Sequence, residues 1–175
     1  MYGPADATGP SLINASYLVT YNNNYPDLGY TVLENGRIPI ERKELDTDSV
    51  VELDPVDNTI QFNRIGYYKI SIRVNAYVPF DGDEFNPDTD FVSIGFRLVN
   101  TDNIYIGESQ WITDETSKEV YAEGIITVEN IANAYELVNL SKRDIYLNTP
   151  KLENINSNSY FVNAPVSIII KYLGR

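Results

Sequence analysis

One segment of this chain, residues 66–78, alternates between apolar and mostly polar side chains. Gly66 introduces it, and Tyr68, Ile70 and Ile72 begin a series of apolar residues at every second position. Successive side chains of a β-strand point to opposite sides of the sheet, so a period of two residues is typical of a strand with one buried face. The segment therefore predicts a long, half-buried strand over residues 67–78.

The remaining sequence favours an all-β fold. It contains 14 Tyr and a single Met, and no long window spaces apolar residues at helical intervals. We expect ten strands, a number typical of a β-sandwich. Their expected ranges are 13–21, 30–33, 37–41, 59–63, 67–78, 91–99, 103–110, 119–128, 135–140 and 160–173. Pro39 places its strand at a sheet edge, because proline has no N–H to donate.

Two motifs and the final strand carry a family resemblance: Thr59-Ile60-Gln61-Phe62, then Gly66-Tyr67-Tyr68-Lys69-Ile70, then the apolar run 165–174. Together they resemble the globular head of complement component 1q and its tumour necrosis factor relatives. Within that superfamily, residues 12–174 are most similar to the bacterial heads that cap collagen-like spore-surface proteins. The resemblance implies a ten-strand jelly-roll β-sandwich that forms a compact homotrimer, usually at the end of a triple-helical stem.

The start of the chain differs in composition from the rest. We expect residues 1–11 to form a flexible leader or a stem remnant, and residues 12–175 to form the head domain. Gly3 and Gly9 are six positions apart, but Asp6 and Leu12 interrupt the glycine at every third position that a collagen helix requires. A collagen-like stem is therefore a partner implied by the resemblance rather than by these residues.

Outward-facing apolar residues predict self-association independently of the family. If Tyr68 points into the core, Tyr67 points away from it, and Tyr121 and Ile125 alternate with a second apolar face in the same way. Ile169 makes the final strand apolar on both sides, and such a strand needs two partners. We expect a homotrimer held by Tyr67, Tyr121, Ile125 and Ile169. The alternative is that an N-terminal strand covers some of these residues.

The residue types exclude most catalytic chemistry. The chain has no His and no Cys, which removes Ser–His pairs, thiolate nucleophiles and imidazole metal sites. No glycine-rich phosphate-binding motif occurs. Paired carboxylates are conceivable among 25 acidic residues, where chance pairs are common. We expect a structural or ligand-binding protein and no enzymatic activity.

The net charge of −12 disfavours nucleic acids and anionic membrane surfaces as partners. No run approaches the roughly 18 apolar residues of a membrane-spanning helix, and the first residues lack the order of a signal peptide. We expect display outside the cell or on a bacterial spore or cell surface, as the resemblance implies. A tip adhesin of a phage or an appendage, with the same fold, is an alternative.

An acidic segment between two expected strands is a candidate calcium site. Calcium takes six to eight oxygen ligands, and some relatives of the complement heads hold it near the trimer apex. The spacing does not match the helix–loop–helix calcium motif. A solvated loop is the alternative interpretation. The candidate ligands are Asp81, Asp83, Glu84, Asp88 and Asp90.

Trp111 is the only tryptophan, and it shares strand parity with Tyr105. We expect both on the outer side of their strand, where exposed aromatic rings stack on sugars. This makes a monomeric carbohydrate-binding β-sandwich the main alternative function. Trp111 also precedes a turn, so it fits a residue that caps the edge of the core. An unidentified protein or glycan is the expected ligand in either case.

Overall fold

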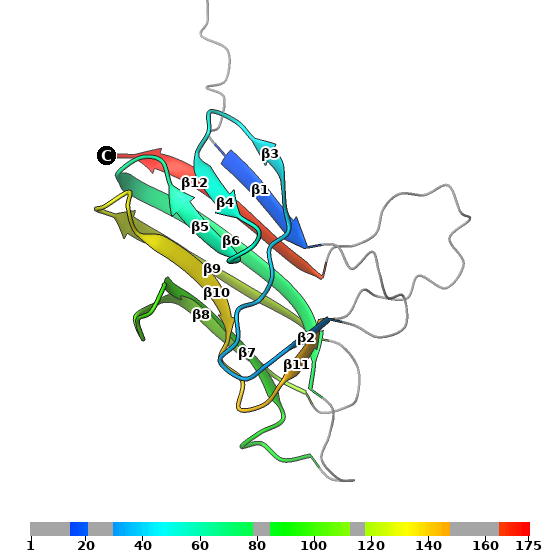
Figure 1. Ribbon diagram of the computed structural model, residues 1–175. Helices are drawn as coiled ribbons and strands as arrows, with labels where there is room; N and C mark the ends of the chain where they lie inside the picture. Colours follow the sequence, from blue (N-terminus) through cyan, green and yellow to red (C-terminus); the bar gives the residue numbers. More distant parts are fainter. Residues whose placement is uncertain (1–14, 21–29, 79–84, 113–117, 148–164) are drawn as a thin grey trace, which may run out of the picture.

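The computed structural model describes residues 15–20, 30–78, 85–112, 118–147 and 165–175. These residues form strands packed as two antiparallel sheets, which face each other in Figure 1. The described parts of the chain contain no helix that is long and apolar enough to cross a membrane. The all-β prediction is confirmed, while the leader predicted over residues 1–11 lies outside the described residues.

The first sheet has seven strands and the second has five. The first contains β1 (Ala15–Thr20), β2 (Tyr30–Val32), β3 (Arg42–Asp46), β6 (Gly66–Tyr77), β9 (Lys118–Val128), β11 (Ile145–Leu147) and β12 (Val166–Gly174). The second contains β4 (Val51–Asp54), β5 (Thr59–Phe62), β7 (Phe91–Leu98), β8 (Ile104–Trp111) and β10 (Ala134–Asn139).

Strand pairing fixes the layout of both sheets. In the first sheet the strands β3, β1, β12, β6 and β9 lie side by side in that order, and β11 and β2 continue beside the far end of β6. The second sheet has the order β4-β5-β10-β7-β8. Strands β3 and β9 are the outermost of these five strands of the first sheet. Each therefore pairs with a neighbour on only one side among the described residues.

The described residues contain twelve strands rather than the ten that we predicted. The short strands β3, β4 and β11 were missed. The range 37–41 is not a strand, since Arg37 forms only an isolated bridge with Val138. Pro39 in this stretch cannot donate a ladder hydrogen bond, which explains why regular pairing does not continue.

Asparagines set the turns between several strands. Asn35, Asn58 and Asn100 all have positive φ values, of 58°, 53° and 61°. Asparagine tolerates this left-handed conformation better than most residues with a side chain. The hydrogen bond from Gly36 N to Leu33 O, at 2.8 Å, closes the first of these turns. Turn chemistry that is visible in the sequence thus positions the strands on either side.

An aromatic cluster forms the centre of the core between the sheets. The ring of Phe62 lies 4.5 Å from that of Tyr68 and 5.0 Å from that of Tyr135, and Tyr135 stacks on Phe96 at 5.7 Å. The Tyr68 hydroxyl donates a hydrogen bond to the Arg64 carbonyl at 2.7 Å, so it is satisfied despite its burial. Burial raises the pKa of Tyr68 to about 12. Two residues of the family motifs, Phe62 and Tyr68, therefore meet in the core.

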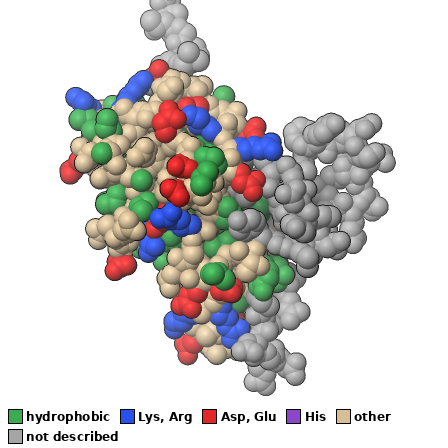
Figure 2. All heavy atoms as spheres, in the orientation of Figure 1, with side chains coloured by type: hydrophobic (Ala, Val, Ile, Leu, Met, Phe, Trp, Pro, Cys, Tyr) green, Lys and Arg blue, Asp and Glu red, His purple; other side chains and the backbone are tan. Residues whose placement is uncertain are grey.

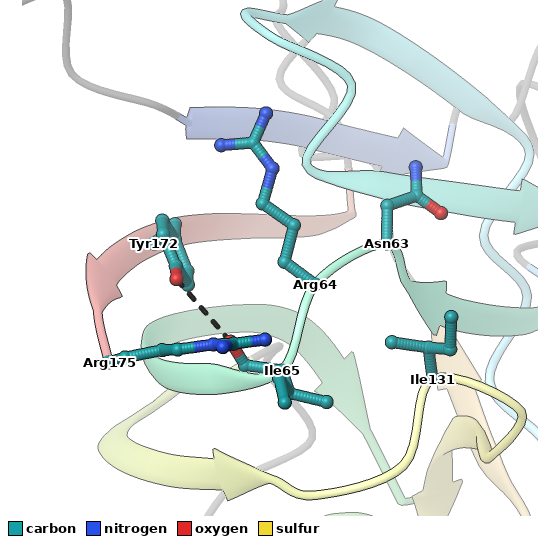
Figure 3. Close-up of a pocket in the computed structure, with 6 residues that line it drawn as sticks. All are labelled: Asn63, Arg64, Ile65, Ile131, Tyr172 and Arg175. Atoms are coloured by element: carbon teal, nitrogen blue, oxygen red, sulfur yellow. Dashed lines mark hydrogen bonds between the residues drawn. The ribbon is translucent and has the colours of Figure 1, made fainter.

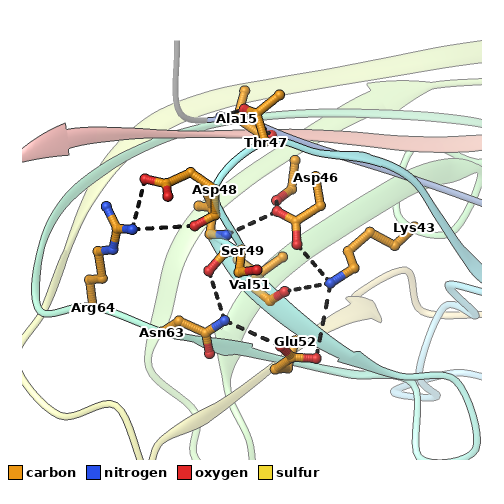
Figure 4. Close-up of polar contacts among 12 residues, drawn as sticks. Ala15, Lys43, Asp46, Thr47, Asp48, Ser49, Val51, Glu52, Asn63 and Arg64 are labelled. Carbon is orange, nitrogen blue, oxygen red and sulfur yellow. Dashed lines mark hydrogen bonds and ion pairs between the residues drawn. The ribbon is translucent and has the colours of Figure 1, made fainter. Parts of the chain in front are cut away.

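A polar network joins the two sheets at one end of the sandwich (Figure 4). The carboxylate of Asp46, at the end of β3, accepts hydrogen bonds from the Ser16 hydroxyl and from Lys43 Nζ and Val50 N, the last two at 2.7 and 2.9 Å. Lys43 Nζ also donates to the Val51 carbonyl at 2.9 Å. Asp46 thereby links β1 in one sheet with Val50, the residue before β4 in the other, and Lys43 links β3 with β4 itself.

We expect Asp46→Asn to lower the free energy of unfolding at pH 7 by about 2 kcal/mol, since hydrogen bonds to a charged group are worth more than neutral ones. Burial raises the pKa of Asp46, but the hydrogen bonds from Lys43 and Ser16 outweigh it and hold the pKa below the ordinary value of an aspartate. The stabilisation is therefore present above the unfolded pKa and is lost as pH falls through the lower folded value.

Urea denaturation at several pH values measures this effect. As the pH is lowered below about 5, the free energy of unfolding of the wild type should fall more steeply than that of Asp46→Asn. Asp102→Asn, at an exposed position, is the matched control and should leave both the stability and its pH dependence unchanged. Equal pH profiles for wild type and Asp46→Asn would contradict the assignment.

Candidate functional site

The face of the first sheet that points away from the core carries several large apolar side chains exposed to solvent. We call it the outer face, and it spans β3, β1, β12, β6 and β9. Large apolar side chains on these strands are between 40% and 63% exposed. Monomeric proteins rarely expose many such residues on one surface. The residues are Leu45, Tyr67, Tyr121, Ile125, Ile169 and Leu173.

Strand register brings these residues onto one continuous surface. Leu45 on β3 pairs with Tyr17 on β1, and Tyr17 pairs with Ile169 on β12. Ile169 pairs in turn with Ser71 on β6, which pairs with Glu123 on β9. One row of side chains therefore crosses five strands, beginning with apolar groups and ending with polar ones.

A polar cluster occupies the β6–β9 side of the outer face. Lys69 Nζ lies 2.8 Å from Glu123 Oε1. The hydroxyls of Tyr121 and Ser71 each donate a hydrogen bond to Glu123 Oε2 at 2.7 Å. The hydrogen bonds from Lys69, Tyr121 and Ser71 lower the pKa of Glu123 to about 2, and the hydrogen bond to Glu123 raises the pKa of Lys69. The cluster therefore stays ionised throughout the physiological pH range.

All four residues predicted to hold a homotrimer lie on the outer face. Tyr67 comes from β6, Tyr121 and Ile125 from β9, and Ile169 from β12. Strand β1 lies beside β12 within the sheet and does not cover them. Sequence reasoning missed Leu45, because the surrounding stretch 42–46 is polar. Its role in the interface, like that of the other four, stays a prediction.

The two aromatic residues predicted to bind a ligand, Trp111 and Tyr105, do not lie together. They are near opposite ends of β8, and six residues of strand correspond to about 20 Å. Tyr105 contacts the buried Tyr135, with ring centroids 5.8 Å apart. Trp111 is 55% exposed and contacts Phe85 and Phe91 instead. Any aromatic site at Trp111 is therefore built with these phenylalanines and without Tyr105.

The acidic segment is only partly described. Asp81, Asp83 and Glu84 lie outside the described residues. Asp88 is exposed, whereas Asp90 is buried and accepts hydrogen bonds from Asn86 N at 2.7 Å and from the Thr89 hydroxyl at 3.1 Å. The described part of the chain contains no group of three acidic residues placed to hold a metal. Asp90 therefore has a structural role in the loop, and calcium binding by the segment stays a prediction.

A hollow of about 360 Å³ opens at one end of the sandwich (Figure 3). The Arg64 guanidinium lies over the Tyr172 ring at 5.7 Å, and its Nη2 atom is 2.7 Å from Asp48 Oδ2. Arg64 is therefore engaged within the protein, and the lining residues include no carboxylate side chain that could act as an acid or a base. They are Asn63, Arg64, Ile65, Ile131, Tyr172 and Arg175.

No protein-family model matches the sequence, and none of the curated proteins matches it. Solved structures do match. Murine APRIL at pH 5.0 gives a TM-score of 0.58 at 7% identity, over 91% of this chain and 98% of that chain. The globular domain of zebrafish complement 1qA gives 0.57 at 7% identity, over 93% and 98%. Eiger TNF from S. frugiperda gives 0.55 at 9% identity, over 93% of each chain.

The architecture and these comparisons define the chain as a jelly-roll domain. Its fold is that of the complement 1q and tumour necrosis factor domains, as the motifs around Phe62 and Gly66 predicted. At 7% to 9% identity the likeness concerns the fold alone. The link to bacterial spore-surface heads therefore stays a proposal.

Proposed function

We propose that this chain is a non-enzymatic head domain and that three copies associate through the outer face into a homotrimer. The observation that supports this most directly is the set of large apolar side chains exposed on that face. The five strands are between 5 and 12 residues long; at about 3.3 Å per residue and about 4.8 Å between strands they form a face of about 700 Å². A stable interface buries about 600 to 1,000 Å² per partner, so the area of the outer face lies within this range.

The chemistry of the outer face also fits an interface between copies. Tyr67 and Tyr121 are aromatic residues with a polar end, a type enriched at protein interfaces. The ion pair between Lys69 and Glu123 lies among the apolar residues. It favours relative orientations of the copies in which polar groups face it, because an apolar surface placed over it would remove its water without replacing the lost hydrogen bonds. Acidic and basic side chains lie mixed together over the surface that Figure 2 shows, where they form no single basic stripe suited to nucleic acid.

The wider role that we propose is surface display. The resemblance to bacterial heads on collagen-like stems supports a position outside the cell or on a spore or cell surface, at the tip of a fibrous protein. Three copies would present identical loops together, so that weak contacts with a protein or glycan ligand add up. The absence of His and Cys from the sequence supports a binding or structural role over catalysis.

We expect Tyr121→Glu to convert the trimer into monomers. The new carboxylate would face Glu123 in the interface, where burial of an unpaired charge is costly. Light scattering coupled to gel filtration measures the mass of each form. Val56→Glu is the matched control, because Val56 is 87% exposed in the turn between β4 and β5. It should remain trimeric.

Two outcomes would overturn this proposal. A Tyr121→Glu variant with the mass of the trimer would show that the outer face is not the interface. A monomeric wild type would favour the monomeric carbohydrate-binding module instead. Genomic context distinguishes a spore-surface head from a tip adhesin of a phage or an appendage.

A further inference from the structure

An exposed aromatic cluster lies at one end of the second sheet, away from the outer face. The Trp111 ring meets Phe91 at 5.7 Å with an interplanar angle of 77°, and meets Phe85 at 6.2 Å with an angle of 82°. Both contacts are edge-to-face, a favourable arrangement for aromatic rings. Trp111 nevertheless remains 55% exposed. The two phenylalanines thus fix the indole while leaving much of its surface available.

Small residues continue the surface beside Trp111. Phe91 pairs with Trp111 across β7 and β8, followed by Ser93 with Ser109 and Gly95 with Gly107. Residues two positions apart on a strand share a face and are about 7 Å apart, so the Ser109 hydroxyl lies beside the indole. Beside these two glycines the side chain of Ile104 borders the surface.

The Ser109 hydroxyl is oriented and able to accept a hydrogen bond. It donates its proton to the Ser93 hydroxyl at 2.8 Å, which leaves its own lone pairs for another donor. Ser109 is exposed, whereas Ser93 is 9% exposed beneath it. The surface therefore offers an exposed aromatic ring, that of Trp111, and beside it an oriented hydrogen-bond acceptor, Ser109 Oγ.

The charge of the site restricts the ligand. Phe85, Phe91, Trp111, Ser109 and Gly107 are uncharged. The neighbouring charged group is the exposed carboxylate of Glu108, which accepts a hydrogen bond from Ser109 N at 3.0 Å and also repels anions. The chain as a whole has a net charge of −12, which repels phosphates and other anions. A nucleic acid base stacked on Trp111 would bring its phosphates with it. A neutral ligand with one apolar face and several hydroxyl groups is the chemistry that fits.

We propose that Trp111, Phe85 and Phe91 form a binding site for a neutral hexopyranose unit of a glycan. The C–H face of the sugar ring stacks on the indole, and one of its hydroxyl groups donates to Ser109 Oγ. The site is complete within one copy of the chain, so single-site binding does not depend on the homotrimer. Three copies in a trimer would add avidity on a surface that displays many glycans.

Trp111 is the only tryptophan in the chain, so the intrinsic fluorescence reports directly from this site. We would titrate the protein with tetrasaccharides of β-linked glucose, N-acetylglucosamine, galactose and mannose. At least one should shift the emission to shorter wavelength and protect it from acrylamide quenching. For a ligand contact this small we expect a dissociation constant of about 1 mM.

Calorimetry with the tightest-binding tetrasaccharide then tests the residues. Trp111→Ala should weaken binding by about tenfold or more, Trp111→Phe by less, and Ser109→Ala by about threefold. Tyr105→Ala is the matched control, because Tyr105 is an exposed aromatic residue near the other end of the same strand. It should bind as the wild type does.

Other results would overturn the proposal. One is the absence of any fluorescence change with all four sugars at about 20 mM, which is far above the expected dissociation constant. The other is an equal loss of affinity for the tetrasaccharide in Tyr105→Ala and Trp111→Ala. The monomeric variant Tyr121→Glu separates this proposal from the homotrimer. It should keep the single-site affinity and lose only the added affinity for a glycan-coated surface.

Discussion

Replacing Gly66 with alanine should lower the free energy of unfolding by about 4 kcal/mol, because two separate obstacles oppose a side chain there. Gly66 has a φ of +144°, which residues with a Cβ rarely adopt. An added Cβ would also lie 2.4 Å from the Gly174 carbonyl oxygen and 2.8 Å from Tyr172 Cε2. The carbonyl belongs to the backbone of β12, whose Gly174 pairs with Tyr67 of β6, so moving it away would break that pairing.

Urea denaturation at one fixed protein concentration measures this loss, since self-association would make stability concentration-dependent. Gly124→Ala is the matched control. The nearest atom to its added Cβ is Ile106 Cγ1 at 2.9 Å, which belongs to a side chain that can shift, so a loss of about 1 kcal/mol is expected. If Gly66→Ala also lowered the free energy of unfolding by only about 1 kcal/mol, the end of β12 could shift away from the added Cβ at little cost, which would contradict the prediction.

The same contact explains why the fold could be predicted from the sequence. Gly66 opens one family motif and Gly174 ends the last strand, and the two glycines meet where β6 and β12 pair. Phe62 and Tyr68 likewise contact each other in the core. These residues carry strong local signals, namely glycine where the backbone needs it and alternating apolar residues where one face is buried. A fold that depends on such positions is visible in a single sequence.

The strands that were missed lack this signal. Strand β3 reads Arg-Lys-Glu-Leu-Asp, and four of its five side chains are exposed. In an edge strand whose side chains are mostly exposed, apolar and polar residues need not alternate, so the sequence pattern does not reveal the strand. Pro39 and its buried neighbours Ile38 and Ile40 gave the opposite error, because they are apolar but belong to no strand, and the stretch forms only the isolated bridge of Arg37 with Val138.

For the candidate site, the sequence predicted which side chains point away from the core, because alternation along a strand gives that information. Parity showed that Tyr67, Tyr121, Ile125 and Ile169 point away from the core. It does not show which strands are neighbours, and the pairing of Ser71 with both Glu123 and Ile169 requires the register of three strands. The ion pair between Lys69 and Glu123 therefore became visible only in the structure.

A second long-range cluster, on the other sheet, had no signal in the sequence at all. Glu136 on β10 is only 2% exposed, and its carboxylate forms ion pairs with Arg37 Nε and with Arg97 Nε, the latter at 2.8 Å. Arg97 lies on the neighbouring strand β7. Arg37 also donates to the Asp57 carbonyl at 2.9 Å, so it connects the turn between β4 and β5 to the cluster. One buried carboxylate thus joins three separate parts of the chain.

Replacing Glu136 with leucine should lower the free energy of unfolding by about 3 kcal/mol, because it leaves the mostly buried Arg97 guanidinium without its carboxylate. The double variant Arg97→Leu/Glu136→Leu should recover most of that loss, since it removes the more buried of the two guanidinium groups that Glu136 neutralises. Arg37, the other partner, is 36% exposed and keeps its hydrogen bond to the Asp57 carbonyl, so water compensates for much of its lost ion pair. Urea denaturation of both single variants and the double variant completes the cycle and gives the coupling energy. If the two single losses simply add in the double variant, the carboxylate does not stabilise the sheet through Arg97. A large coupling would show that Glu136 stabilises β10 and β7 mainly by neutralising a charge that their packing has buried.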